Sequence, residues 1–415
     1  MLIKWLNHKS GKWTIIWNSF AGAISAGQAA IVLIFISAKQ GIKIAGMVTI
    51  AYAIANVFMS IGKYGVRNYQ VTDINERYSF KEYVQCRRIT IFLSFFLMLL
   101  YIAYGFLCKG YSFQKILIIF EVSVLKNIDA FEDVFIGRYQ QIGRLDIGAK
   151  ILFIRQFIVT ALICVLVIVK CNIHIVFIFS IFVSIVVDVY TIHRTMTIPV
   201  IDKRLERDKI VEILKKNLPL CVGTTLAIYV GNIPKYVIDA YSTEETQAIF
   251  GFIMMPVFVV TLLNTFIYQP FIKDLGEEWK QDLRLFCKRI VKQCLIVLFM
   301  SVSIVVLFSF IGLPILSQIY SVDLTKYNDE FVILLIGGAV YALAYYLTVP
   351  ITVLRQQKYI AIVYIGVTAL TILFGEFFVI YGDMMGAAIL YLVLNLIIAI
   401  LFFAVLFVNL NKKDV

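Results

Sequence analysis

The sequence predicts an all-α membrane protein with about twelve transmembrane helices, arranged as two six-helix lobes around a central cavity. Three observations lead to this prediction. Of the 415 residues, 61% are hydrophobic and only 15% are charged, whereas soluble domains are about 45–50% apolar and about 25% charged. Apolar runs of about 20 residues, enough to cross a bilayer, recur along the whole chain. The 38 basic residues outnumber the 26 acidic ones and gather in the short connections between these runs.

The apolar runs predict twelve spans, separated six from six by a long hydrophilic segment. The predicted spans lie near 14–37, 42–62, 89–108, 115–137, 148–169, 173–193, 217–238, 247–270, 290–312, 330–353, 360–381 and 384–408. The first run is too long for the core of a cleavable signal peptide. We therefore expect one lobe over 1–193, a cytoplasmic amphipathic linker over 194–216 and a second lobe over 217–415.

The distribution of lysine and arginine predicts the orientation, because cytoplasmic loops carry an excess of both. With twelve spans and an inside N-terminus, 29 of these residues fall on the cytoplasmic side and 7 in outer loops. Without the fourth span the counts become 12 inside and 25 outside, which inverts the rule. We therefore expect 115–137 to cross the membrane and both termini to be cytoplasmic.

The fourth span is unusual because it carries five ionisable residues. At 100° per residue, they occupy one face of the helix about 140° wide. These residues are Glu121, Lys126, Asp129, Glu132 and Asp133. Each would cost about 2.5–3.5 kcal/mol if it faced lipid at mid-bilayer. We expect this face to line a hydrated pathway; a buried structural ion cluster is the alternative.

Other predicted spans add polar groups. Asn18 and Gln28 lie in the first span, Arg155 early in the fifth and Asp188 late in the sixth. Because the fifth and sixth spans run in opposite directions, Arg155 and Asp188 should lie at similar depth. Two interpretations stay open: Arg155 and Asp188 form an ion pair that connects the two helices, or Arg155 contacts the substrate.

The seventh span is interrupted by proline and glycine, at Pro219, Gly223, Gly231 and Pro234. Such helices can bend or expose backbone carbonyls to a site. Lys235 near the outer end of this span either reaches the outer interface or guards the exit of the cavity.

Several function classes lack the residues they need. There is no G-x-x-x-x-G-K-[ST] motif for an ATP motor, and the seven cysteines are scattered without a C-x-x-C pair. We expect no metal or cofactor, and no nucleic-acid partner, since the basic residues follow the topology rule. The outer loops are too short for much of a catalytic domain, so we expect no enzyme.

Five loop segments resemble a known family. They are GKYGVRNYQVTD (62–73), YSFKEY (78–83), GRYQQIGRLDIGAK (137–150), GLPILSQIYSVDLTKY (312–327) and RQQKY (355–359). They are similar to the polysaccharide-transporter branch, which includes the O-antigen (Wzx-type) flippases, of the multidrug/oligosaccharidyl-lipid/polysaccharide exporters. The resemblance covers nearly the whole chain. One departure is Ser321, where the family commonly has glycine.

The resemblance implies a flippase in the bacterial plasma membrane. Its cargo would be an undecaprenyl-diphosphate-linked oligosaccharide for a surface polysaccharide, such as the O-antigen of lipopolysaccharide, a capsule or an exopolysaccharide. Membrane lipids and polysaccharide polymerase machinery would be its partners. Alternatives are a drug/cation antiporter of the same superfamily and a membrane glycosyltransferase or polymerase acting on lipid-linked sugars.

A sugar-diphosphate head group needs cations along its path. We expect Lys126 and Arg155 to supply them inside the membrane, with Arg67 at the inner mouth, unless it only follows the topology rule, and Lys235 at the outer mouth. Proton or sodium coupling would use one of the intramembrane acids, Glu121, Asp129, Glu132, Asp133 or Asp188.

Overall fold

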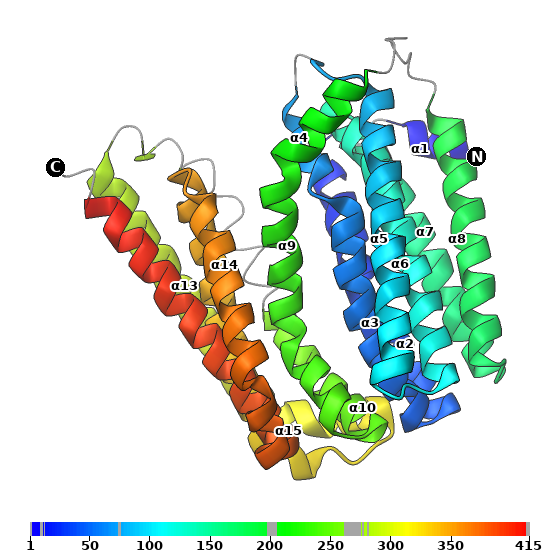
Figure 1. Ribbon diagram of the computed structural model, residues 1–415, viewed down its shortest axis with the longest axis vertical. Helices are drawn as coiled ribbons and strands as arrows, with labels where there is room; N and C mark the ends of the chain where they lie inside the picture. The colour runs from blue at the N-terminus through cyan, green and yellow to red at the C-terminus, as the bar shows by residue number, and fades with distance from the viewer. Residues whose placement is uncertain are drawn as a thin grey trace. The chain divides into compact units, whose positions relative to one another are not determined.

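The computed structural model describes residues 2–8, 11, 13–73, 76–196, 206–260, 275, 278–279 and 282–411. Over these residues the chain forms helices and turns and no strand (Figure 1). It divides into two compact units, Met1–Ile228 and Tyr229–Val415, which we call unit 1 and unit 2.

The described residues of unit 1 form a bundle of helices. They are α1 (Leu2–Asn7), α2 (Trp13–Gln40), α3 (Ile42–Lys63), α4 (Val66–Thr72), α5 (Phe80–Cys108), α6 (Phe113–Gln141), α7 (Leu145–Ile168), α8 (Ile173–Thr195) and the first part of α9 (Arg207–Tyr241). The turn from α3 to α4 passes through two residues with positive φ, Tyr64 (51°) and Gly65 (69°).

Serine residues fix where two of these helices begin. Ser79 caps α5 in a reciprocal arrangement with Glu82: its side chain accepts from the Glu82 amide, and the Glu82 carboxylate accepts from the Ser79 amide. Ser112 caps α6 by accepting from the amide of Lys115. The α5 cap places the start of this helix nine residues before the predicted span at 89–108, which matters for the site below.

Helix α6, the charged fourth span of the prediction, is the central helix of unit 1. It packs against α3, α4, α5, α7 and α8. Its 29 residues make it about 43 Å long, enough to cross a bilayer. The apolar remainder of the helix is therefore packed mainly against protein.

The described residues of unit 2 include the end of α9 and several further helices. They are α10 (Glu244–Ile253), α13 (Leu283–Tyr320), α14 (Asn328–Val353) and α15 (Gln357–Asn411), with a 3₁₀ turn at Thr325–Tyr327. Helix α14 packs against both α13 and α15. Helix α15 is bent at Asp383 (φ 44°, ψ −124°), and its two parts correspond to the predicted spans 360–381 and 384–408.

The protein is an all-α, multi-pass membrane protein, as predicted. Eight helical stretches of the described residues are long and apolar enough to cross a bilayer, and α15 alone contains two predicted spans. Helix α6 is long enough but carries the five charges. Part of the predicted span 247–270 and part of the linker 194–216 lie outside the described residues. The central cavity and the domain boundaries stay predictions.

Candidate functional site

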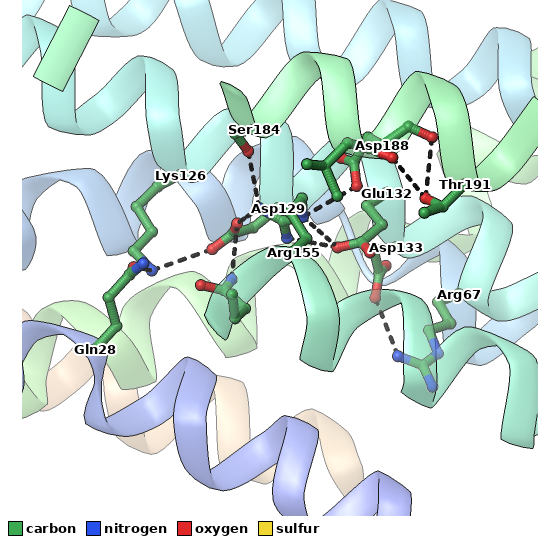
Figure 2. Close-up of polar contacts among 12 residues, drawn as sticks. Gln28, Arg67, Lys126, Asp129, Glu132, Asp133, Arg155, Ser184, Asp188 and Thr191 are labelled. Atoms are coloured by element: carbon green, nitrogen blue, oxygen red, sulfur yellow. Dashed lines mark hydrogen bonds and ion pairs between the residues drawn. The ribbon is translucent and has the colours of Figure 1, made fainter. Parts of the chain in front are cut away.

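Arg155 on α7 is the centre of a buried ion cluster in unit 1 (Figure 2). Its Nη1 donates to Oδ1 of Asp129 at 2.7 Å and to Oγ of Ser184 at 3.2 Å. Its Nε and Nη2 both donate to Oε2 of Glu132. The Nε also lies 3.1 Å from Oδ1 of Asp188. One guanidinium thus holds three carboxylates from α6 and α8, and the expected Arg155–Asp188 pair is part of this cluster.

Lys126 extends the cluster towards α2. Its Nζ donates to Oε1 of Gln28 at 2.8 Å and to Oδ2 of Asp129 at 3.1 Å. The same ammonium lies 5.6 Å from the centre of the Tyr52 ring, within the range of a cation–π interaction. Gln28 in turn donates to Thr160 on α7. The Asp129 carboxylate therefore joins the lysine to the arginine.

Asp133 extends the cluster towards the other end of α6, where two arginines hold it. Arg87 Nη2 donates to its Oδ2 at 2.8 Å, and Arg67 Nη1 to its Oδ1 at 3.3 Å. Arg87 also donates to the carbonyl of Gly62 at 2.6 Å and is fully buried, whereas the Arg67 side chain is 27% exposed. Arg67 donates in addition to Gln140.

Arg87 is a site residue that the sequence reading missed, because it was counted among the basic residues of an inner loop. The signal was present in the sequence. Ser79 followed by Glu82 is a capping pattern, and it starts the helix early enough to place Arg87 two turns inside α5.

The remaining residues predicted for the site lie apart from this cluster. Glu121 pairs with Nδ1 of His174 on α8 at 3.1 Å. Asn18 is exposed and lies about 15 Å along α2 from Gln28. Lys235 is half-buried in unit 2, whereas the cluster belongs to unit 1. The structure therefore joins six of the eleven predicted residues into one network, and it pairs two more, Asp133 and Arg67, beside that network on α6.

The charges of the cluster balance as a whole but not locally. Around Arg155 and Lys126, two cations face three carboxylates, whereas Asp133 faces two arginines. The excess carboxylate is Asp188. Although it is within ion-pair distance of Arg155, neither of its buried oxygens accepts a hydrogen bond from a described residue. A buried carboxylate without hydrogen bonds is costly, so this position suits a cation or a proton.

Three of the five loop segments that carry the family resemblance, 62–73, 137–150 and 78–83, pack together at one end of unit 1. Gln141 donates to the carbonyl of Asp73 at 2.8 Å, and Arg138 pairs with Glu76 at 2.7 Å. A Cβ added to Gly137 would lie 2.5 Å from Oε1 of the fully buried Gln70. Glycine at 137 is thus required by the close approach of 62–73 to 137–150.

The third loop segment, 78–83, fastens this end to the start of α9. The carboxylate of Asp73 accepts from the amide of Tyr78 and from the Tyr83 hydroxyl. Lys216 of α9 donates to the Tyr78 hydroxyl at 3.5 Å. It also donates to Glu212 at 2.7 Å, and this bond holds the pKa of Glu212 below its usual value. Burial raises the pKa of the Tyr78 phenol to about 12, so it stays protonated at neutral pH.

No protein-family model matches the chain, and no curated protein matches it. Several solved structures share its fold over nearly the full length. A multidrug resistance MATE family transporter of the MOP superfamily, in its inward-facing conformation, matches with a TM-score of 0.67 and 13% identity, covering 94% of this chain and 96% of that one. The outward-facing conformation of such a transporter has a TM-score of 0.61 and 13% identity, covering 100% and 99%.

A MOP superfamily transporter from Pyrococcus furiosus, described as having a binding pocket of reverse polarity, has a TM-score of 0.63 and 12% identity, covering 100% of this chain and 98% of that one. These likenesses show the fold. The chain therefore has the two-lobed fold of these transporters, as the sequence predicts.

Proposed function

We propose that the protein is a transporter that moves an undecaprenyl-diphosphate-linked oligosaccharide across the bacterial plasma membrane for surface polysaccharide synthesis. The observation that carries the proposal is the mixed cluster of cations and carboxylates buried within the spans of unit 1. Intramembrane charges are expensive and usually belong to transport pathways. The transporter fold and the loop resemblance to sugar-lipid flippases support the same function.

Lys126 is the better of the two intramembrane cations for a diphosphate. Arg155 is already held by three carboxylates and Ser184, so an anion would have to displace several charge-assisted bonds. Lys126 has one carboxylate and one neutral amide as partners. Displacing Gln28 breaks a single hydrogen bond from the ammonium, which contributes about 1.5–3 kcal/mol, and this costs less than displacing the several carboxylates of Arg155. Arg155 would then organise the acids rather than bind the cargo first.

Asp188 is the best placed of the five acids to carry the coupling ion. Protonation of Asp188 removes the excess negative charge beside Arg155 and leaves the arginine shared by Asp129 and Glu132. Because Arg155 joins α6, α7 and α8, a change at Asp188 alters how these helices are held together.

The orientation belongs to the proposal as well. Both termini and the segment 194–216 would be cytoplasmic, so that Arg67 and the loop segments 62–73 and 137–150 face the side where the cargo is made. Polymerase machinery would receive the cargo on the outer side. Lys235 would lie at the outer mouth.

A drug/cation antiporter is the second candidate. The local excess of one carboxylate at Asp188 favours it, because a cationic drug and a coupling ion can compete for such a site. The solved structures of similar fold include multidrug resistance transporters.

The deciding experiment measures the transport rates of two cargoes in proteoliposomes: a lipid-linked oligosaccharide and a lipophilic organic cation. We expect the wild-type protein to move the oligosaccharide-lipid, and Lys126→Met to lower that rate at least tenfold while the protein remains folded and inserted. Lys170→Met, which removes an exposed lysine at the end of α7, is the matched control and should leave the rate unchanged. Transport of the organic cation alone would assign the protein to the antiporter class instead.

A further inference from the structure

Helix α14 of unit 2 carries a polar face made of tyrosine and threonine. On α14, Tyr341, Tyr345, Thr348 and Thr352 recur at spacings of four, three and four, which places them on one side of the helix. Tyr341 is half-buried and Tyr345 is 40% exposed. Their ring centres are 6.2 Å apart with the planes inclined by 36°. We call these four residues the tyrosine face of α14.

The rest of unit 2 exposes a different kind of surface. Helices α13 and α15 expose large apolar side chains along their length, such as Phe299 (71%), Phe310 (78%) and Ile372 (71%), as expected for helices in contact with lipid. In α14, which is described throughout, the exposed large hydrophobic residues are Ile336 and Tyr345. The tyrosine face is therefore not an ordinary lipid-facing surface.

The hydroxyl groups on this face strengthen the contrast. Thr348 and Thr352 donate to carbonyls of their own helix, those of Tyr345 and Thr348. A tyrosine hydroxyl at the end of a long ring cannot reach its own helix backbone in this way. The tyrosines therefore place a hydrogen-bonding hydroxyl at the outer end of each ring.

A second tyrosine pair lies on the part of α9 that belongs to unit 2. The rings of Tyr229 and Tyr236 are stacked, with centres 5.1 Å apart and planes inclined by 17°. Both are half-buried, as is Asn232 between them. On α15, Tyr364 lies near Tyr341 and Tyr345. Described parts of unit 2 thus carry aromatic rings with neutral hydrogen-bonding groups on separate helices, and on α9 the charged Lys235 lies beside them.

We infer that the tyrosine face of α14 binds the neutral sugar rings of the cargo; the inference rests on the proposed function. A sugar ring has an apolar C–H face and a rim of hydroxyls. Tyrosine matches both, because its ring packs against the apolar face and its hydroxyl bonds the rim. The face carries no formal charge, so it suits the sugar, whereas the ion cluster of unit 1 suits the diphosphate and the coupling ion.

The binding experiment separates the two parts of the cargo. One probe is the oligosaccharide released from the host's lipid-linked pool, without its diphosphate. The other is a short prenyl diphosphate without sugar. Binding of each to the purified full-length protein is measured calorimetrically for the wild type, Tyr345→Ala, Tyr341→Ala and Lys126→Met.

We expect Tyr345→Ala and Tyr341→Ala each to weaken sugar binding about tenfold, equivalent to about 1.4 kcal/mol, and to leave diphosphate binding within twofold. Lys126→Met should do the reverse. Tyr104→Ala, which removes a tyrosine of similar exposure (51%) from α5, should change neither. If both α14 variants still bind the sugar as the wild type does, the inference is wrong, and the proposed function is not affected by that result. A wild-type protein that binds neither probe overturns the proposed function as well.

A second measurement decides whether lipid covers this face. Tyr345→Trp and Tyr104→Trp are compared with the wild type in bilayers whose acyl chains carry bromine, which quenches tryptophan on contact. We expect the added emission at 104 to be strongly quenched and that at 345 to be protected, and oligosaccharide to alter the emission at 345 only. Equal quenching at both positions would show that lipid occupies the tyrosine face and would overturn the inference.

Discussion

The two units of this protein are both helical bundles, yet their interiors are held together by different polar chemistry. In unit 1, Arg155, Lys126 and Arg87 bind four carboxylates within the membrane-spanning helices. In unit 2, the buried Tyr346 hydroxyl donates to Gln293 at 2.7 Å, without any charge. One fold thus accommodates an ionic interior and a neutral one.

The difference bears on what each unit can do. A cluster of opposite charges can change its arrangement when one proton or one ligand charge is added, because each buried ion depends on its partners. A neutral hydrogen bond does not change with protonation at physiological pH. Unit 1 therefore suits charge-coupled events, and unit 2 suits the recognition of an uncharged polar ligand.

The largest expected effect is that of Arg155→Ala. The change leaves Asp129, Glu132 and Asp188 buried without their shared cation, so we expect it to lower the free energy of unfolding by about 3–5 kcal/mol. Thermal unfolding in detergent measures the loss. In the double variant Arg155→Met with Glu132→Met, much of the stability should return, because an apolar pair can replace a buried ion pair. No recovery would mean that the cation has a role beyond neutralising its neighbours.

Asp188→Asn and Asp133→Asn compare two kinds of buried carboxylate inside unit 1: one in local excess and one shared by two arginines. Asp188 is in local excess, so its replacement should change the free energy of unfolding by less than about 1.5 kcal/mol. Gradient-driven transport should nevertheless fall at least tenfold in proteoliposomes. Asp133→Asn deprives two arginines of their shared carboxylate and should destabilise the protein more strongly. If Asp188→Asn retains full dependence on the ion gradient, the coupling ion binds elsewhere.

Tyr346→Phe tests the neutral interior of unit 2. It leaves the Gln293 acceptor buried without its donor, and we expect a loss of about 1–3 kcal/mol in the free energy of unfolding. The double variant Tyr346→Phe with Gln293→Leu should be closer to the wild type, because neither polar group is then left alone. A single-variant loss as large as that of Arg155→Ala would remove the contrast between the units.

The smallest expected effect concerns packing in unit 2. A Cβ at Gly337 would lie 2.7 Å from the Tyr391 ring, so Gly337→Ala should cost about 1–2 kcal/mol through overpacking. Gly366 has no atom near its virtual Cβ, and Gly366→Ala should be neutral or stabilising by up to about 1 kcal/mol. Chemical denaturation measures the free energy of unfolding of both variants. Equal changes in the two variants would mean that α14 and α15 separate more easily than their contact indicates.

The charged face of α6 shows how far the sequence alone reaches. Helical periodicity places Glu121, Lys126, Asp129, Glu132 and Asp133 on one face, and antiparallel spans place Arg155 near Asp188; the structure brings Arg155 and Asp188 together. Periodicity does not say which neighbouring helix meets that face. Glu121 was therefore grouped with the others, although its partner is His174 on α8 rather than Arg155. Arg87 was missed for another reason, because the start of α5 was placed too late in the sequence.

Composition, apolar run length and the positions of lysine and arginine determined that this chain is an all-α, multi-pass membrane protein, because water and hydrocarbon impose these patterns residue by residue. Only the tertiary structure decided that α6 lies at the centre of unit 1, that Arg155 binds three carboxylates and that Asp188 is left without a hydrogen bond. It also decided that α14 presents tyrosine where α13 and α15 present apolar residues. These features depend on which helices are neighbours, and packing between residues far apart in the chain determines the neighbours.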